Sequence, residues 1–269
     1  MPFNTSAVKP DNVPVLTHPV DAPSAFTPDA LMAAVRAERK LSGEPVPPVC
    51  VLDFDGDLTD WLVANGVAQP WSSWACFHTP MYAWDVDGTA CAIVPRTIGG
   101  PFAVLIAEQL RASGARIVLG LTSASRVSGS LPVPSLVVPT QAIRDEGTSY
   151  HYLAPRRWVA ADPVLSDLLA TGLDVGLPVF RGSVWTTDAP YRETAEQLTR
   201  YAEEGVLAVE MQAASLFAFA AAKHVPAGIV AHVTNAVDHT EDAFAKGSHA
   251  IGRQLLDQMC RCAMRYLDI

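Results

Sequence analysis

Basic side chains are scarce in this chain of 269 residues, which has 19 Lys and Arg against 28 Asp and Glu and a formal net charge of −9. Proteins that bind nucleic acid use basic patches to neutralise phosphates. No basic stripe is visible along the sequence. The charge balance therefore excludes a typical duplex-binding protein, and we expect a small-molecule substrate and no nucleic-acid partner.

Long apolar runs are also missing, although hydrophobic residues make up 49% of the sequence. A membrane-spanning helix needs about 20 apolar residues, and the run at residues 216–222 is much shorter. The first residues lack the basic and apolar segments of a secretory leader. We therefore expect no membrane partner.

Cysteines are few, and their five positions are scattered without the spacing of a zinc finger. The two that lie nearest each other, Cys260 and Cys262, are separated by one residue only. This usage is typical of free thiols in a reducing compartment. We predict a cytoplasmic protein with no metal site and no cofactor.

Apolar runs alternate with amphipathic segments from residue 49 onward. Strands are predicted at residues 49–52, 90–94, 117–121, 136–138, 179–185, 208–210 and 228–233. Helices are predicted at residues 102–113, 162–171, 189–203, 213–223 and 243–267. This alternation is typical of a mainly parallel sheet with helices on both faces. We predict an α/β fold of three layers, α/β/α, around a mixed, mainly parallel central sheet.

The first 48 residues are predicted to form an extension, and residues 49–269 a single domain. Residues 1–26 are rich in proline and show no periodicity, which is typical of an extended arm. A helix is predicted after them, because Thr27 is a good N-cap and Pro28 suits the first helical position. Gly43 is expected to end that helix.

Four separated segments carry most of the chemical information. They are residues 97–101 (TIGGP), 144–152 (RDEGTSYHY), 185–193 (WTTDAPYRE) and 209–215 (VEMQAAS). In this order and at these separations they resemble the nucleoside phosphorylase superfamily, which includes purine nucleoside phosphorylase, uridine phosphorylase and adenosylhomocysteine-type nucleosidases. The resemblance covers about residues 50–267. It implies the fold given above, an enzyme that cleaves an N-glycosidic bond, and a homo-oligomer.

The resemblance implies that the sugar binds at Glu210, Met211 and Gln212. Met211 is expected to pack on the sugar ring through its flexible thioether. Gln212 stands where the family usually has a glutamate that binds two ribose hydroxyls. An amide bonds a hydroxyl but carries no charge to stabilise a cationic sugar. Glu210 is a candidate catalytic residue.

The leaving heterocycle is expected at the end of the strand at residues 228–233, where the family places an Asp or an Asn. Here Asn235 fits that position, and Asp238 and His239 are alternative acid/base candidates. We therefore take Asn235 and Asp238 as candidate catalytic residues.

Trp185 and Tyr191 are expected to form an apolar or stacking wall of the same pocket. Pro190 stands where pyrimidine-specific relatives tend to have an aromatic residue.

The phosphate site is where the sequence departs from the family. Relatives carry arginines at three positions that are filled here by Asp60, Gly120 and Phe77. Phosphorolysis needs such cations to hold a phosphate dianion. Thr122 and Ser123 remain as hydroxyl donors and as candidate substrate-binding residues.

These departures predict that phosphorolysis is lost, since Arg96 and Arg126 are not in register with the missing positions. Water would then attack the sugar, with Glu210, Asp57 or Asp60 as the base. Two alternatives stay open. In one the pocket serves a non-nucleoside reaction such as a cyclisation or an isomerisation, and in the other the protein is a catalytically silent small-molecule binder.

A rival interpretation rests on the stretch VLDFDGDL at residues 51–58. It resembles the first motif of haloacid-dehalogenase-type phosphatases, in which an aspartate nucleophile is followed two residues later by a second aspartate. Asp53 and Asp55 fit, but Asp57 stands where that family has threonine. Residues 84–89 (WDVDGT) form a second partial match. The alternative to a catalytic motif is a structural turn rich in Asp and Gly.

Overall fold

The computed structural model describes residues 13–236 and 248–269. Its strands are β1 (Val49–Asp53), β2 (Gln69–Pro70), β3 (Tyr82–Val86), β4 (Thr89–Pro95), β5 (Ile117–Arg126), β6 (Ser135–Asp145), β7 (Trp158–Ala160), β8 (Val179–Thr187), β9 (Val206–Glu210) and β10 (Ala227–Ala236). Its α-helices are α1 (Pro28–Arg39), α2 (Asp57–Ala64), α3 (Gly100–Ala112), α4 (Pro163–Gly172), α5 (Ala195–Glu203), α6 (Ala213–Lys223) and α7 (His249–Leu267). Short 3-10 helices occur at Pro14–Leu16, Thr148–His151 and Pro190–Arg192.

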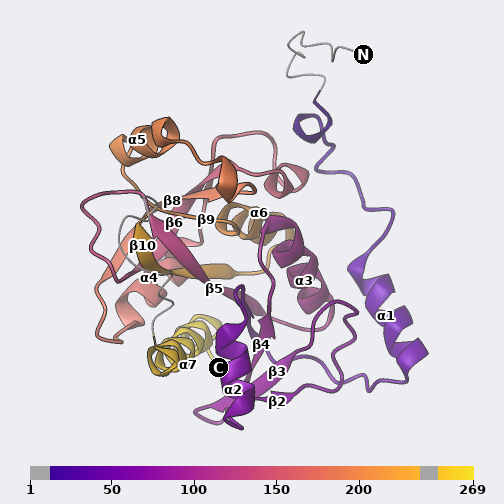
Figure 1. The fold of residues 1–269 in the computed structure, drawn as a ribbon. Helices are drawn as coiled ribbons and strands as arrows, with labels where there is room; N and C mark the ends of the chain where they lie inside the picture. Colours follow the sequence, from indigo (N-terminus) through magenta and orange to yellow (C-terminus); the bar gives the residue numbers. More distant parts are fainter. Residues whose placement is uncertain (1–12, 237–247) are drawn as a thin grey trace.

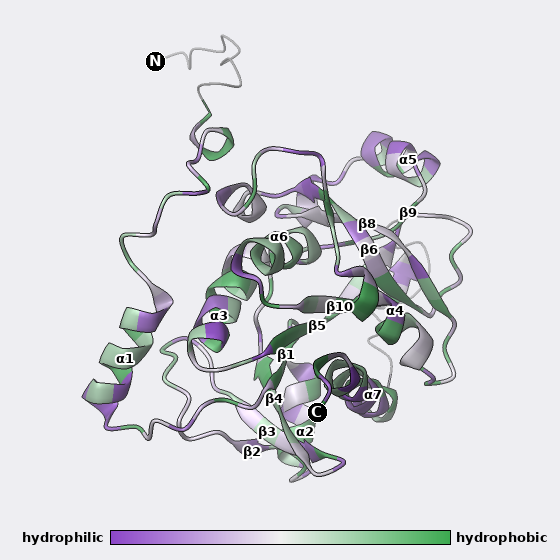
Figure 2. Ribbon diagram, turned by 180° about the vertical axis from the view of Figure 1, so that it is seen from behind, coloured by the Kyte–Doolittle hydropathy of each residue, from purple (hydrophilic) through white to green (hydrophobic). Residues whose placement is uncertain are grey.

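Helices cover both faces of the sheet, as Figure 1 shows. In β1 every residue is buried, and successive side chains point to opposite faces. Cys50 and Leu52 pack with residues of α3 and α6, whereas Val49 and Val51 pack with residues of α2, α4 and α7. In Figure 2, β1 and β5 are largely hydrophobic, while α5 carries much hydrophilic surface. The predicted three-layer α/β architecture is confirmed.

The strand order is β10-β6-β8-β9-β5-β1-β4-β3-β2, with β7 beside β6. The longest pairings, β6 with β8 and β5 with β10, are parallel, as predicted for a mainly parallel mixed sheet. Because β10 pairs with both β5 and β6, part of the sheet closes into a ring. Local periodicity does not encode strand order, so this closure could not be predicted from the sequence.

Helix α1 begins as predicted, because the Thr27 hydroxyl accepts a hydrogen bond from a backbone N–H of its first turn. The predicted end at Gly43 is wrong, since Lys40 adopts a left-handed conformation with φ of 55° and ends the helix there. Met32 and Val35 bury the inner side of α1 next to α3. None of the described helices is both long and apolar enough to cross a membrane.

A hairpin of β3 and β4 occupies the stretch that the sequence offered as a second phosphatase motif. Its turn is Asp87-Gly88, with φ of 54° and 87°. An Asp-Gly pair between two apolar runs is a strong hairpin signal, because both turn residues need positive φ. The Asp-Gly pair is visible in the sequence, but the hairpin was not predicted from it. The short helix α2 was not predicted either.

One predicted helix start is wrong, and another lies outside the described residues. The helix predicted at residues 189–203 begins only at Ala195, because Thr194 and Gln197 form a reciprocal capping box. The helix predicted from residue 243 is described from His249 onward, and residues 243–247 lie outside the described part of the chain.

Gly120 of β5 lies directly beneath an aromatic ring. A Cβ atom built at Gly120 would approach two ring atoms of Phe54 to 2.7 and 2.8 Å and a side-chain atom of Ile229 to 3.1 Å. Phe54 is fully buried at 1% exposure, so its ring has little freedom to move away. The ring therefore occupies the space that any side chain at position 120 would need.

We predict that Gly120→Ala destabilises the protein by about 1–3 kcal/mol through overpacking against Phe54. The loss should shrink when Gly120→Ala is made in a Phe54→Leu background, because the smaller side chain yields. Urea denaturation of the four proteins of this double-mutant cycle measures the coupling. Gly129→Ala is the matched control, since nothing lies within 4 Å of its added Cβ atom. Equal losses from Gly120→Ala in both backgrounds would contradict the packing argument.

Candidate active site

A cavity of about 550 Å³, which we call the main cavity, opens where β5, β9 and β10 carry their polar residues. Parallel strands bring such residues to one edge of a sheet. The cavity unites most of the residues predicted as the site. They are Thr122, Ser123, Tyr191, Glu210, Met211, Gln212 and Asn235.

Glu210 ends β9 and is buried beside the start of α6. One carboxyl oxygen accepts hydrogen bonds from the backbone N–H groups of Gln212 and Ala213, at 2.6 and 2.8 Å. The other accepts a hydrogen bond from the Thr186 hydroxyl at 2.5 Å. Burial raises the pKa of Glu210 to about 7, although these three hydrogen bonds oppose the rise. Both oxygens are therefore engaged in holding the turn between β9 and α6.

Gln212 is buried, and only the oxygen atom of its side-chain amide is hydrogen-bonded within the described chain. Its Oε1 accepts hydrogen bonds from the Thr122 hydroxyl at 3.3 Å and from the Met211 backbone N–H at 3.2 Å. The Nε2 group has no hydrogen-bond partner among the described residues. Gln212 thus presents to the main cavity a hydrogen-bond donor where the family resemblance implied an acceptor carboxylate.

Tyr191 and Asn235 stand at the rim and the wall of the main cavity. Tyr191 lies in the 3-10 turn after β8 and is 99% exposed, next to Pro190. Asn235 lies near the end of β10, and its Nδ2 donates to the Thr234 hydroxyl at 3.1 Å. The Oδ1 atom of Asn235 remains available as an acceptor.

Trp185 does not line the main cavity, so the prediction that it forms a wall is not supported. It is 1% exposed, its indole N–H donates to Asp145 at 3.0 Å, and its ring meets Tyr201 edge to face at 4.8 Å. The side chain belongs to the apolar cluster beneath α5. The candidates Asp238 and His239 lie outside the described residues.

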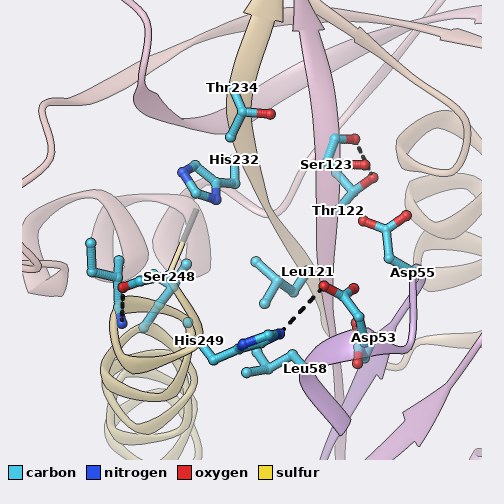
Figure 3. Close-up of a pocket in the computed structure, with 14 residues that line it drawn as sticks. Asp53, Asp55, Leu58, Leu121, Thr122, Ser123, His232, Thr234, Ser248 and His249 are labelled. Atoms are coloured by element: carbon cyan, nitrogen blue, oxygen red, sulfur yellow. Dashed lines mark hydrogen bonds and ion pairs between the residues drawn. The ribbon is translucent and has the colours of Figure 1, made fainter. Parts of the chain in front are cut away.

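A second and smaller space, which we call the side chamber, adjoins the main cavity (Figure 3). Its volume is about 60 Å³, and it shares Asp55, Thr122 and Ser123 with the main cavity. Across from these residues, His232 of β10 and His249 of α7 also line the chamber, and the remaining polar lining residues are Asp53, Asp57, Thr234 and Ser248.

Asp53 is the last residue of β1, and its carboxylate holds the loop that follows. Its Oδ1 accepts the Gly56 N–H at 3.1 Å, and its Oδ2 accepts the Thr59 N–H and hydroxyl at 2.9 and 2.7 Å. Burial nevertheless raises the pKa of Asp53. A carboxylate bonded on both oxygens is a structural group, which argues against the phosphatase interpretation. Within the described chain, no group of three or more His, Cys, Asp and Glu residues is arranged to hold a metal ion.

The two histidines of the side chamber have different surroundings. Burial lowers the pKa of His232, so its imidazole is neutral at pH 7. His249 stacks on Trp61 with ring centroids 5.9 Å apart, and its Nε2 lies 3.8 Å from a carboxylate oxygen of Asp57.

No Lys or Arg from the described part of the chain lines either space. Asp60, at one of the lost arginine positions, forms an exposed ion pair with Arg96 outside both spaces. Arg126 donates to the Leu131 carbonyl at 3.4 Å, and Phe77 is an exposed surface residue. Neither Arg96 nor Arg126 therefore lines the main cavity or the side chamber.

In the sequence, Asp55 stands out only as part of the rival phosphatase motif, and neither His232 nor His249 was predicted as a site residue. A signal for Asp55 existed, because it follows a buried parallel strand by two residues, where ligand-binding side chains gather. No such signal existed for the histidines. His232 lies within a strand whose closure onto β5 could not be foreseen.

Comparison with known proteins gives matches along most of the chain. A family model described as the phosphorylase superfamily matches residues 48–268. A guanosine phosphorylase of Halorubrum lacusprofundi is 30% identical over 55% of this chain and 61% of its own length. Uridine phosphorylases of Salmonella typhimurium and Escherichia coli are 25% and 24% identical over 58% of this chain and 68% of theirs. The chain thus aligns with less than two thirds of the guanosine phosphorylase.

We predict that Glu210→Gln preserves the fold and removes a pH dependence of stability. The pKa of Glu210 is near 7 in the folded protein against an ordinary value of 4.5, so folding takes up a proton between these values. The stability from the protonated carboxyl is present below pH 4.5 and is lost as the pH rises to 7, by roughly 3 kcal/mol. The variant keeps the hydrogen bonds, because its Oε1 accepts two N–H groups and its Nε2 donates to Thr186.

Urea unfolding at a series of pH values measures this effect. The stability of the wild type should fall relative to that of Glu210→Gln between pH 4.5 and 7 and run parallel to it above pH 7. Glu203→Gln, at an exposed carboxylate of α5, serves as the control and should follow the wild type. Parallel curves for the wild type and Glu210→Gln across the whole range would refute the assignment.

Proposed function

The chain belongs to the phosphorylase superfamily, and on this premise we propose that it cleaves the N-glycosidic bond of a nucleoside-type substrate without phosphate. The observation that carries the proposal is the charge of the site. No Lys or Arg of the described residues lines the two spaces, while Asp53, Asp55 and Asp57 line the side chamber.

Electrostatics makes phosphate a poor reactant here. A carboxylate at contact distance repels an anion by about 1–4 kcal/mol per unit charge in a partly solvated site. The bidentate arginine contacts that hold phosphate elsewhere in such sites are lacking. His232 is neutral at pH 7 because burial lowers its pKa, so it supplies no compensating charge. Water is uncharged and meets no such repulsion.

The sugar is assigned to the main cavity between Met211 and Gln212 on one side and β5 on the other. Met211 gives a polarisable apolar surface for the ring. The free amide nitrogen of Gln212 donates to a sugar hydroxyl, and Thr122 and Ser123 supply further hydroxyl groups. Support for this placement comes from the way these side chains line one space.

The leaving heterocycle is assigned to Asn235 and Tyr191. Asn235 offers an acceptor and a donor to an oxo-substituted ring, and the exposed Tyr191 offers a stacking surface at the rim. Asp238 keeps its candidacy on sequence grounds alone. Glu210 acts by positioning, since both of its oxygens are bonded within the chain.

A reducing compartment and self-association complete the proposal. All five cysteines are buried and none forms a disulfide, which favours the cytoplasm. Ile98 and Tyr191 expose apolar surface beside the mouth of the main cavity, and contact with a second copy would cover it.

We predict that base release from a panel of purine and pyrimidine nucleosides proceeds at the same rate with and without phosphate. The sugar product should be the free sugar and not the sugar 1-phosphate, because water supplies the new oxygen. Chromatography of the base and of the sugar product measures both quantities, and the uridine phosphorylase of Escherichia coli serves as the phosphate-dependent reference.

A rate that rises more than about tenfold with phosphate, equivalent to 1.4 kcal/mol of barrier, would overturn the proposal. Thermal shifts with nucleosides but no turnover would point instead to a silent binder. The absence of both shifts and turnover would point to a pocket used for a non-nucleoside reaction.

A further inference from the structure

The side chamber lies beside the main cavity. The two spaces meet at Asp55, Thr122 and Ser123, which line both. Figure 3 shows the Asp55 carboxylate directed toward Thr122 and Ser123, on the side of the chamber opposite His232. The Asp55 carboxylate therefore borders both spaces.

The two spaces differ in volume, and therefore in what they can hold. The main cavity, at about 550 Å³, suits an organic substrate. The side chamber, at about 60 Å³, is far smaller. One water molecule needs roughly 10–15 Å³ measured in this way, so the chamber holds a few water molecules and not a second organic reactant.

Four other carboxyl groups near the site are already engaged. Asp53 and Glu210 accept hydrogen bonds on both oxygens. Asp60 pairs with an arginine outside both spaces, and Asp57 faces the imidazole of His249.

Glu193 lines the main cavity without a hydrogen bond or ion pair from its carboxylate to a described residue, but it does not line the side chamber. Asp55 differs from all five of these carboxyl groups. It forms no hydrogen bond or ion pair with any described residue, and it is only partly exposed. An unengaged carboxylate that lines both the substrate space and a water-sized chamber has the placement of a general base. We infer that Asp55 is the catalytic base that activates a water molecule held in the side chamber. This inference rests on the function proposed above.

The reaction step balances without any further reactant. The water oxygen forms a bond to the anomeric carbon of the sugar while one of its protons passes to the Asp55 carboxylate. The bond between that carbon and the ring nitrogen breaks, and its electron pair leaves with the heterocycle. The nitrogen takes a proton from solvent, and Asp55 later returns its own proton to solvent.

Titratable groups lie on every side of Asp55. Asp53 ends β1 and Asp57 begins α2 beside it, Glu193 and Glu210 line the main cavity with it, and His232 and His249 line the side chamber with it. A variant that only perturbs this network shifts a pH profile, whereas loss of the base removes its acidic limb.

The experiment compares Asp55→Asn with Asp174→Asn in hydrolysis of the best nucleoside of the panel, without phosphate. Both substitutions replace an aspartate by its neutral isostere, but Asp174 is exposed after α4 and lines neither space. For Asp55→Asn we expect kcat to fall by about 10²–10⁴-fold, with KM unchanged. The acidic limb of the kcat profile should disappear, and Asp55→Glu should restore part of the rate. Asp174→Asn should retain the wild-type kcat.

The outcomes separate the two claims. If the wild type hydrolyses the nucleoside and Asp55→Asn keeps its kcat and its acidic limb, the assignment of the base is wrong and the proposed function stands. A fall in kcat of equal size in Asp174→Asn would also overturn the assignment, because the effect would then be one of charge or folding. If the wild type shows no hydrolysis of any nucleoside, both claims fail together.

Discussion

Two buried carboxyl groups fix the first turn of α6, and the geometry of the main cavity depends on them. Glu210 accepts the backbone N–H of Gln212 from one side, and Glu146 accepts the Ser215 hydroxyl at 2.5 Å and the Ser149 N–H at 2.9 Å from the other. Negative groups are favoured at the positive end of a helix, and each charge-assisted hydrogen bond contributes roughly 1.5–3 kcal/mol. Because both oxygens of Glu210 are bonded in this turn, we expect the chemistry of the site to come from other side chains.

The sequence was sufficient for the family, the layers and most of the main cavity. Glu210, Gln212 and Asn235 were found through the family resemblance, which implies that the sugar and the heterocycle bind where these strands end. Trp185 was misplaced because a strand has two faces, and only the packed structure shows that this ring turns toward Tyr201 and away from the cavity. The role of Asp55 depends on which neighbouring carboxylates are already bonded, and no local pattern carries that information.

The shortage of basic groups is sharpest where the substrate is expected, because several arginines serve the scaffold instead. Arg144 is 4% exposed and donates to the Ser149 hydroxyl and to the carbonyls of Leu153 and Ala154. Its guanidinium therefore fixes a loop and is not available to a ligand. Arg96 is held by Asp60 at the surface. The negative charge of the site thus has two causes. The chain has few Lys and Arg residues, and arginines such as Arg144 and Arg96 bond to other parts of the protein.

The contact between Phe54 and Gly120 also bears on how this lineage is able to change. An arginine at position 120 would have to displace a ring that is fully buried. A larger side chain at position 120 therefore requires a smaller one at position 54, so these two positions are constrained as a pair and neither is free to vary alone.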